Sequence, residues 1–155
     1  MKREYFMRKA IELAIENVKN GGGPFGALIV HNNNIVATGV NRVTSNNDPT
    51  AHAEIMAIRS ACSKLGTFNL SGCEIYTSCE PCPMCLGAIY WSHIDKIYYG
   101  ANQYDAAAID FDDSFIYREL ELNVTDRKKP MENLLHDEAL TPFNVWRSKD
   151  DKVVY

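Results

Sequence analysis

Apolar positions along residues 1–100 repeat with two different periods, one typical of helices and one typical of strands. Across residues 5–19, apolar residues such as Phe6 and Ala10 recur at helical spacing between charged ones, and the glycines and proline at 21–24 end this helix. The same pattern predicts, in chain order, a helix at 5–19, strands at 27–30 and 35–40 around a turn at 31–34, a polar loop at 41–50, a helix at 51–65, a strand at 73–77, a tight loop at 78–81, a helix at 83–92 and a strand at 95–99.

Strands that alternate with helices predict an α/β protein, a three-layer α/β/α sandwich around a mixed sheet. Periodicity is weaker over residues 101–155, where we predict only a short helix near 114–120 and a helix near 142–149 that Pro142 would start. The chain has 155 residues, enough for one substantial core, and it shows no repeat or linker. We therefore predict one domain, residues 1–155.

Composition narrows the class of protein. The apolar share of 46% and the charged share of 23% are those of a soluble globular protein. No apolar run is long enough to cross a membrane, and the N-terminus opens onto a patterned helix, so we expect no membrane partner, no targeting segment and a cytoplasmic location. The net charge of −4 argues against a nucleic-acid partner, and the short basic run at 127–129 is interpreted as a solvated loop.

The chain has five cysteines, and three of them lie within seven residues. An odd number without a secretory signal argues against a disulfide framework. The clustering of Cys79, Cys82 and Cys85 in a cytosolic chain instead favours metal or redox chemistry.

A C-x-x-C pair opens the helix predicted at 83–92. Pro83 suits the first helical position, so Cys82 lies at the cap and Cys85 one turn later, and both sulfurs can face one point. The positive end of a helix favours thiolates. Two thiolates and the imidazole of His52 make a three-ligand zinc site whose fourth position stays open, as it does in catalytic sites.

His52 and Glu54 open the helix predicted at 51–65. In the first turn both side chains can reach a point beyond the helix end, so the imidazole can bind the metal while the carboxylate reaches the metal-activated water. Zinc lowers the pKa of such a water towards about 7. Glu54 can take a proton from the water and return it to a leaving nitrogen. H-x-E followed by P-C-x-x-C is a signature of zinc deaminases, and we predict that reaction class.

Three other interpretations of the cysteines stay open. A structural zinc site would need a fourth ligand, for which Cys79 is the candidate, although it precedes Pro81 and is expected to pack at a strand end. A redox pair of Cys82 and Cys85 would leave the H-x-E segment unused. A non-catalytic zinc-binding module would have no need of Glu54.

The chain resembles the cytidine deaminase superfamily over residues 23–27, 46–54 and 77–91, and the last two of these segments contain the metal motif. The first and third of these segments are shared broadly with tRNA adenosine deaminases. The features that resemble bacterial guanine deaminases of the short, cytidine-deaminase-like type are residues 111–117, Pro142-Phe143, Trp146-Arg147 and the terminal Tyr155. The resemblance covers nearly the whole chain.

The resemblance implies a cytidine deaminase-like fold with a five-stranded mixed sheet and one Zn²⁺ per subunit. It also implies a homodimer whose subunits exchange their C-terminal segments, about residues 120–155. Weak periodicity in that region agrees with such an exchange, because its apolar face would be directed at a neighbour.

The resemblance further implies roles for residues outside the metal site. They are a hydrogen bond to the purine from Asn41, pocket walls from Phe25 and Trp91, proton transfer by Asp113, and closure of the site by Tyr155. Each position has a structural alternative: a turn residue, core packing, a disordered terminus or, for Asp112 and Asp113, a helix cap. Of the two aspartates we favour Asp113 as the functional acid.

The reaction implied is the hydrolysis of guanine, a small-molecule purine, to xanthine and ammonia. Water adds at C2 while Glu54 passes a proton to N3, and Asp113 serves as a second proton carrier. The alternatives are guanosine, another aminated ring such as ammeline or cytosine, and adenosine in tRNA. Acidic charge and the absence of a basic C-terminal helix weigh against the tRNA substrate.

Overall fold

The computed structural model describes residues 2–155, and this part of the chain divides into two compact units. The first unit extends to Ser114 and the second is Phe115–Tyr155. The first contains all the strands of the described residues, and the second contains helices and irregular segments.

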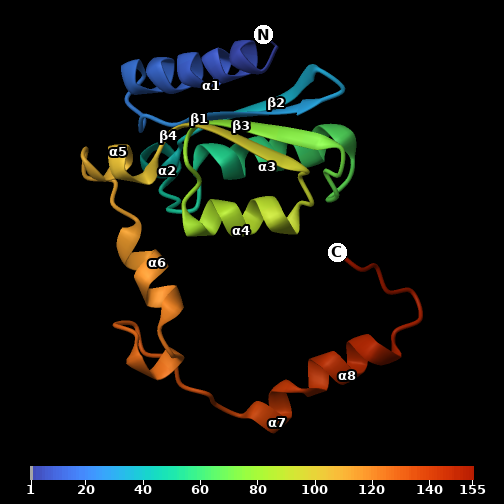
Figure 1. The fold of residues 1–155 in the computed structure, drawn as a ribbon. Coiled ribbons are helices and arrows are strands. Elements are labelled where there is room, and N and C mark those ends of the chain that lie inside the picture. Colours follow the sequence, from blue (N-terminus) through green and yellow to red (C-terminus); the bar gives the residue numbers. More distant parts are fainter. Residues whose placement is uncertain (1) are drawn as a thin grey trace. The chain divides into compact units, whose positions relative to one another are not determined.

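A mixed sheet forms the centre of the first unit (Figure 1). Its strands, in the spatial order β2-β1-β3-β4, are β1 (Gly26–His31), β2 (Asn34–Val40), β3 (Cys73–Cys79) and β4 (Lys96–Ala101). β1 pairs antiparallel with both β2 and β3, and β4 pairs parallel with β3.

The prediction of a fifth strand is wrong, because the sheet has four strands within residues 2–155. The strand at 95–99 becomes β4 at the edge of the sheet. After it the first unit forms the helix α5 (Gln103–Ala107), which the side chain of Asn102 caps, and then the start of α6 at Ser114. Asn102 accepts hydrogen bonds from the backbone N–H groups of Tyr104 and Asp105, so the local capping chemistry turns the chain into a helix at this point.

The hairpin at the start of the sheet forms where the sequence predicts it. Asn32 and Asn33 have φ values of 48° and 61°, and both therefore lie in the left-handed region. Two successive residues of this conformation make the turn that matches the twist of paired strands, and asparagine tolerates it better than most residues do.

The two faces of the sheet are covered by different helices (Figure 1). On one face, Leu28 and Val30 pack with Phe6 and Ala10 of α1 (Lys2–Lys19). Facing the other way, alternate β1 residues pack in a second core with residues of α3 (Ala53–Leu65) and α4 (Pro83–Trp91): Ala27, Ile29, Ala57 and Ile89. This period of two, with apolar residues on both faces, produces the predicted helix, sheet and helix layers.

Close backbone packing fixes the start of α3 against the sheet. A Cβ atom at Gly39 would lie 2.2 Å from the backbone oxygen of Ala53 and 2.4 Å from the nitrogen of Ala57. Only glycine allows β2 and α3 to approach so closely. The contact positions His52, directly before the helix, relative to the end of β2.

The predicted polar loop at 41–50 contains one short helix, α2 (Val43–Asn46), which corrects that expectation. Four residues are too few for apolar periodicity to reveal a helix. Its end is marked by Asn47 in the left-handed conformation, with φ 49°.

The second unit contains α6 (Ser114–Glu121) from Phe115 onward, the 3-10 helix η1 (Val124–Asp126), α7 (His136–Ala139) and α8 (Thr141–Ser148). The helices predicted near 114–120 and 142–149 are confirmed as α6 and α8, and Pro142 lies in the first turn of α8. No residue from Phe115 to Tyr155 is buried. Across residues 2–155, none of the helices combines the length and the apolar character that a bilayer span requires.

Candidate metal centre and active site

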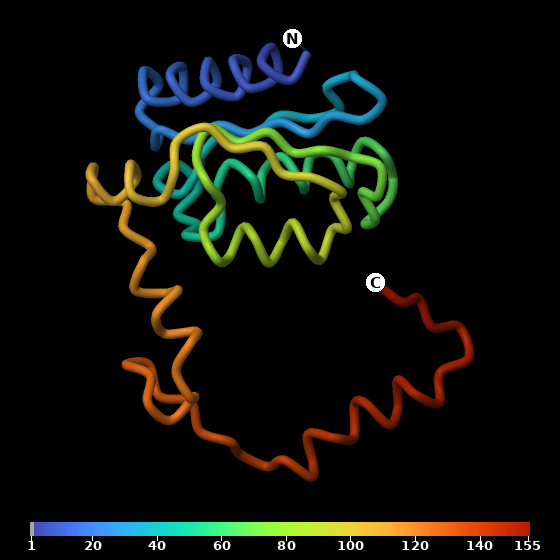
Figure 2. The backbone as a smooth tube through the Cα atoms, viewed as in Figure 1, coloured from blue at the N-terminus to red at the C-terminus, as the bar shows by residue number. Residues whose placement is uncertain are grey.

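Two helix starts bring the predicted metal ligands together. His52 precedes α3 and Cys82 precedes α4, both with extended backbone at the N-cap position. Pro83 occupies the first turn of α4, as predicted, and Cys85 lies one turn along and is buried. α3 and α4 begin at the same end of the sheet, where β2 and β3 end (Figure 2).

The three donor atoms form a compact triangle. Nδ1 of His52 lies 3.6 Å from Sγ of Cys82 and 3.5 Å from Sγ of Cys85, and the ligand atoms of all three residues lie within 4.8 Å of one another. Tetrahedral zinc at its usual bond lengths holds neighbouring nitrogen and sulfur ligands about 3.5 Å apart. The residues present therefore fit zinc, with one coordination position left for water or substrate.

The two thiols hold their protons unequally. The pKa of Cys82 is lowered to about 4, first by the hydrogen bond that it shares with Cys85 and also by His52. The reciprocal hydrogen bond raises the pKa of Cys85, as does its burial. The hydrogen bond to Cys82 raises the pKa of His52. A metal binds both sulfurs as thiolates and the imidazole as the neutral base, so metal binding displaces protons from this cluster.

Glu54 lies beside the metal ligands and is almost completely buried, with 7% of its surface exposed. Its Oε2 lies 3.4 Å from Sγ of Cys85, and its Oε1 lies 3.3 Å from Oγ1 of Thr77. Burial raises the pKa of this carboxyl group above its usual range. A buried carboxyl with a raised pKa, beside a set of metal ligands, is a candidate for accepting and releasing a proton during a reaction.

Cys79 does not join the metal ligands. It ends β3, as expected, and its Sγ lies 3.9 Å from the backbone oxygen of Asn102. Burial raises the pKa of its thiol to about 11, which disfavours a thiolate. Among the His, Cys, Asp and Glu side chains of residues 2–155, only His52, Cys82 and Cys85 converge in this way, so a four-ligand structural site has no support.

Phe25 and Asn41 lie at the same end of the sheet as the metal ligands. Phe25 directly precedes β1 and Asn41 directly follows β2, and these strands pair through Gly26 and Val40. The backbone N–H of Asn41 donates to the oxygen of Phe25 at 3.2 Å. The Phe25 ring meets the ring of Phe111 edge-on, with centroids 5.0 Å apart. Sequence reasoning did not give Phe111 a role of its own.

The two aspartates after Phe111 have different environments. The carboxylate of Asp112 accepts a hydrogen bond from the backbone N–H of Ser114 at 2.8 Å, the capping interaction considered from the sequence. Oδ1 of Asp113 is buried and has no hydrogen-bond partner within residues 2–155. Burial raises the pKa of Asp113, and the negative charge of Cys82 raises it further.

Trp91 lies at the far end of α4 from the metal ligands. Trp91 is exposed and ends α4, about 13 Å along the helix axis from Cys82. Tyr155 belongs to the second unit and is exposed. Both stay predictions that rest on resemblance.

Comparison with known proteins places this site in a family. Residues 1–101 match the family model described as the cytidine and deoxycytidylate deaminase zinc-binding region. A guanine deaminase from Bacillus subtilis is 51% identical over 156 residues, a match that covers 100% of both chains. A tRNA-specific adenosine deaminase from Aquifex aeolicus is 43% identical over 101 residues, which is 65% of this chain and 67% of that protein.

Solved structures agree with these relationships. The X-ray structure of guanine deaminase from Bacillus subtilis has a TM-score of 0.97 with 51% identity and covers 100% of this chain and 99% of its own. A structure of a guanine deaminase from Nitrosomonas europaea has a TM-score of 0.66 with 38% identity over 70% of this chain and 63% of its own. The chain belongs to the cytidine and deoxycytidylate deaminase family of zinc-binding proteins.

Proposed function

We propose that this protein hydrolyses guanine to xanthine and ammonia at a zinc site formed by His52, Cys82 and Cys85. The observation that carries the proposal is the placement of buried Glu54 against this ligand set, 3.4 Å from Sγ of Cys85. The choice of guanine is supported by the alignment with a guanine deaminase along the full length of the chain. The tRNA adenosine deaminase relative matches only 65% of the chain.

The reaction exchanges the amino group on C2 of guanine for oxygen from water. When bound, zinc supplies the activation of that water, because it lowers the pKa of a water ligand towards about 7. Glu54 accepts a proton from the attacking water and donates it to N3 as the water oxygen bonds to C2. The proton left on the added oxygen then passes to the amino nitrogen, the bond between C2 and that nitrogen breaks, ammonia leaves, and the added oxygen becomes the C2 carbonyl of xanthine.

Asp113 is the candidate for that second proton transfer. Its partnerless buried oxygen is available to accept a hydrogen bond from the departing amino group, whereas Asp112 already holds the backbone of Ser114. Burial raises the pKa of Asp113 above its usual range, which makes its carboxyl a better proton acceptor. This difference supports Asp113 over Asp112 as the functional acid.

Asn41 and Phe25 are proposed to hold the purine ring. Hydrogen bonds of Asn41 within residues 2–155 use its backbone groups and Oδ1 and leave Nδ2 to donate to a ring acceptor. Phe25, held edge-on by Phe111, offers an aromatic surface for stacking. Trp91 is proposed as the second wall of the purine pocket, and only the sequence resemblance supports this role.

We further propose a cytoplasmic homodimer that exchanges residues 120–155, with Tyr155 closing the partner's site. Large apolar side chains of the second unit are exposed, among them Leu134, Phe143, Val145 and Val154. Exposure of so many apolar side chains marks a surface that another chain covers. All five cysteines are free thiols, which suits a reducing compartment.

The substrate is tested by measuring ammonia release from guanine, guanosine, adenine, cytosine, ammeline and a tRNA anticodon stem. We expect release from guanine, with xanthine as the second product. Release from guanosine at a higher kcat/KM than from guanine would move the assignment to the nucleoside. Release from the tRNA stem alone would contradict the proposal.

A further inference from the structure

One side chain outside the metal site holds the backbone of Asn41 and that of Gly23, two residues before Phe25. Asn17, near the end of α1, is 7% exposed, and it continues the buried stripe of Phe6, Ala10 and Ala14 on that helix. Its Nδ2 donates one hydrogen bond to the backbone oxygen of Gly23 at 2.8 Å and another to the backbone oxygen of Asn41 at 3.0 Å. Both protons of the amide are therefore used.

The segment between α1 and β1 is shaped around this amide. The backbone N–H of Gly22 donates to the backbone oxygen of Asn17 at 2.8 Å. A Cβ atom at Gly22 would lie 2.4 Å from Nδ2 of Asn17, and one at Gly23 would lie 3.2 Å from Cγ of Asn41. Glycine at both positions lets the backbone close over the two asparagine side chains.

Further hydrogen bonds carry this restraint to the purine-binding residues. Asn41 donates from its backbone N–H to the oxygen of Phe25, and its Oδ1 accepts from the N–H of Val43 at 3.2 Å. Asn17 thus holds the backbone carbonyl of Asn41 and that of Gly23, to which the backbone N–H of Phe25 also donates. Within residues 2–155, these hydrogen bonds leave Nδ2 as the donor of Asn41 that a ligand can use.

We infer that Asn17 is a positioning residue, which sets Asn41 and Phe25 for purine binding without touching the purine. The inference rests on the proposed function, because it concerns the binding of the same substrate. A carboxylate at this position would have the same shape, but it would face two carbonyl oxygens with no proton to share. Asn41 and Phe25 would then move while the metal ligands stay in place.

The test is Asn17→Asp in the full-length, zinc-loaded enzyme, with guanine as substrate. We expect KM to rise roughly tenfold and kcat to change less than about threefold, because substrate binding is lost and the chemical step is not. Zinc content should equal that of the wild type. Should Asn17→Asp fail to fold, Asn17→Ser keeps one donor and should show a smaller rise in KM.

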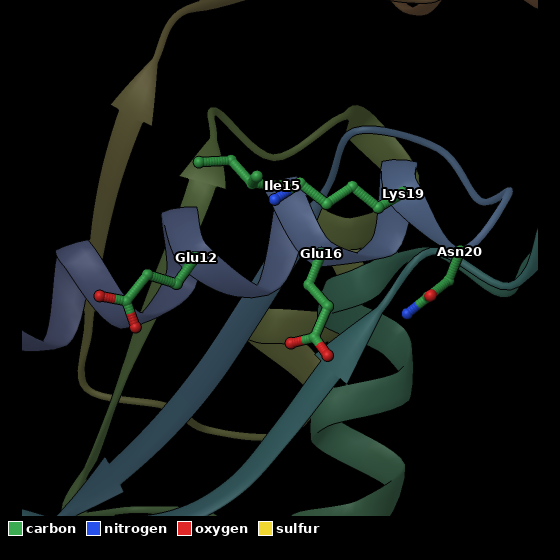
Figure 3. Close-up of a pocket in the computed structure, with 5 residues that line it drawn as sticks. All are labelled: Glu12, Ile15, Glu16, Lys19 and Asn20. Atoms are coloured by element: carbon green, nitrogen blue, oxygen red, sulfur yellow. The ribbon is translucent and has the colours of Figure 1, made fainter.

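Asn20→Asp is the matched control, the same chemical change three residues along. Figure 3 shows Asn20 at the surface, where it lines an open hollow with Glu16 and Lys19. This variant should keep the wild-type KM. In an Asn41→Ala background, the KM effect of Asn17→Asp should shrink, because one of the two residues that it positions is already gone.

Three results would overturn the inference: wild-type KM in folded Asn17→Asp, an equal rise in Asn20→Asp, or full additivity of Asn17→Asp with Asn41→Ala. Failure of the proposed function looks different, since the wild type would release no ammonia from guanine. The same comparison of variants would then use the substrate that the ammonia panel identifies, and the same three results would decide it.

Discussion

The hydroxyl of Thr77 lies 3.3 Å from Oε1 of Glu54 and donates to the backbone oxygen of Cys79 at 2.9 Å. A hydroxyl donates one hydrogen bond and accepts others. Thr77 can therefore donate to ionised Glu54, or accept from protonated Glu54 while it donates to Cys79. It can serve both protonation states that the proposed reaction requires of Glu54.

Replacement of Thr77 by valine removes the hydroxyl but keeps the shape of the buried side chain. We expect Thr77→Val to lower kcat for guanine roughly tenfold, because Glu54 loses its second hydrogen-bond partner. Thr77→Ser keeps the hydroxyl and should retain most of the activity. Zinc content, measured in both variants, should not change. A valine variant with wild-type kcat would show that Glu54 does not depend on Thr77.

The raised pKa of Glu54 has a consequence for the metal-free protein. A carboxyl whose pKa is higher in the folded state stabilises that state below the unfolded pKa, near 4.5, and this stability is lost as the pH rises through the folded pKa. Glu54→Gln stays neutral at every pH. Its melting temperature relative to the wild type should therefore increase as the pH rises above about 4.5. Exposed Glu16→Gln is the control for the loss of a carboxyl group at the surface. A constant offset for Glu54→Gln would contradict the burial argument.

Because Asp112 and Asp113 have different environments, we predict that their substitutions affect activity differently. Asp113→Asn should lower kcat for guanine about tenfold or more, because its carboxyl, whose Oδ1 is buried, is proposed to exchange a proton with the amino group. Asp112→Asn keeps an oxygen that accepts from Ser114 and should cost little activity. Steady-state kinetics of both variants decide the point, and a larger loss in Asp112→Asn would reverse the assignment.

Exchange of the C-terminal segment predicts complementation between two inactive chains. One chain carries Glu54→Gln and the other lacks Tyr155. In a mixed dimer with exchanged tails, the site that keeps Glu54 is closed by the intact tail of its partner. Refolding the two chains together should therefore restore guanine turnover that neither shows alone. If each tail serves its own chain, mixing restores nothing.

The elements of residues 2–101 were predictable because burial imposes a period on them. α1 and β1 carry apolar residues at spacings of about 3.6 and 2, and both were located within a few residues. α2 and α5 span four and five residues, too few for a period. Asn47 in the left-handed conformation ends α2, and the side chain of Asn102 caps α5. The fifth strand was expected from resemblance and was not among the strands located from the pattern.

The residues of the site also differ in whether the sequence could predict them. His52, Cys82 and Cys85 lie in local motifs that open helices, so their convergence could be predicted and is confirmed. Thr77 and Asn17 contact their partners across 23 and 24 residues of sequence, and no local motif marks them. A polar residue on the buried stripe of α1 was nevertheless a signal for Asn17, because buried amides require partners.

The central claim is tested most directly by measuring xanthine and ammonia formed from guanine by zinc-loaded wild-type protein and by Glu54→Gln, with zinc content determined for both. We predict one xanthine and one ammonia for each guanine consumed by the wild type. The variant should retain its zinc and lose activity by about 10²-fold to 10⁴-fold. A wild type that forms no xanthine, or a variant that retains full turnover, would contradict the account.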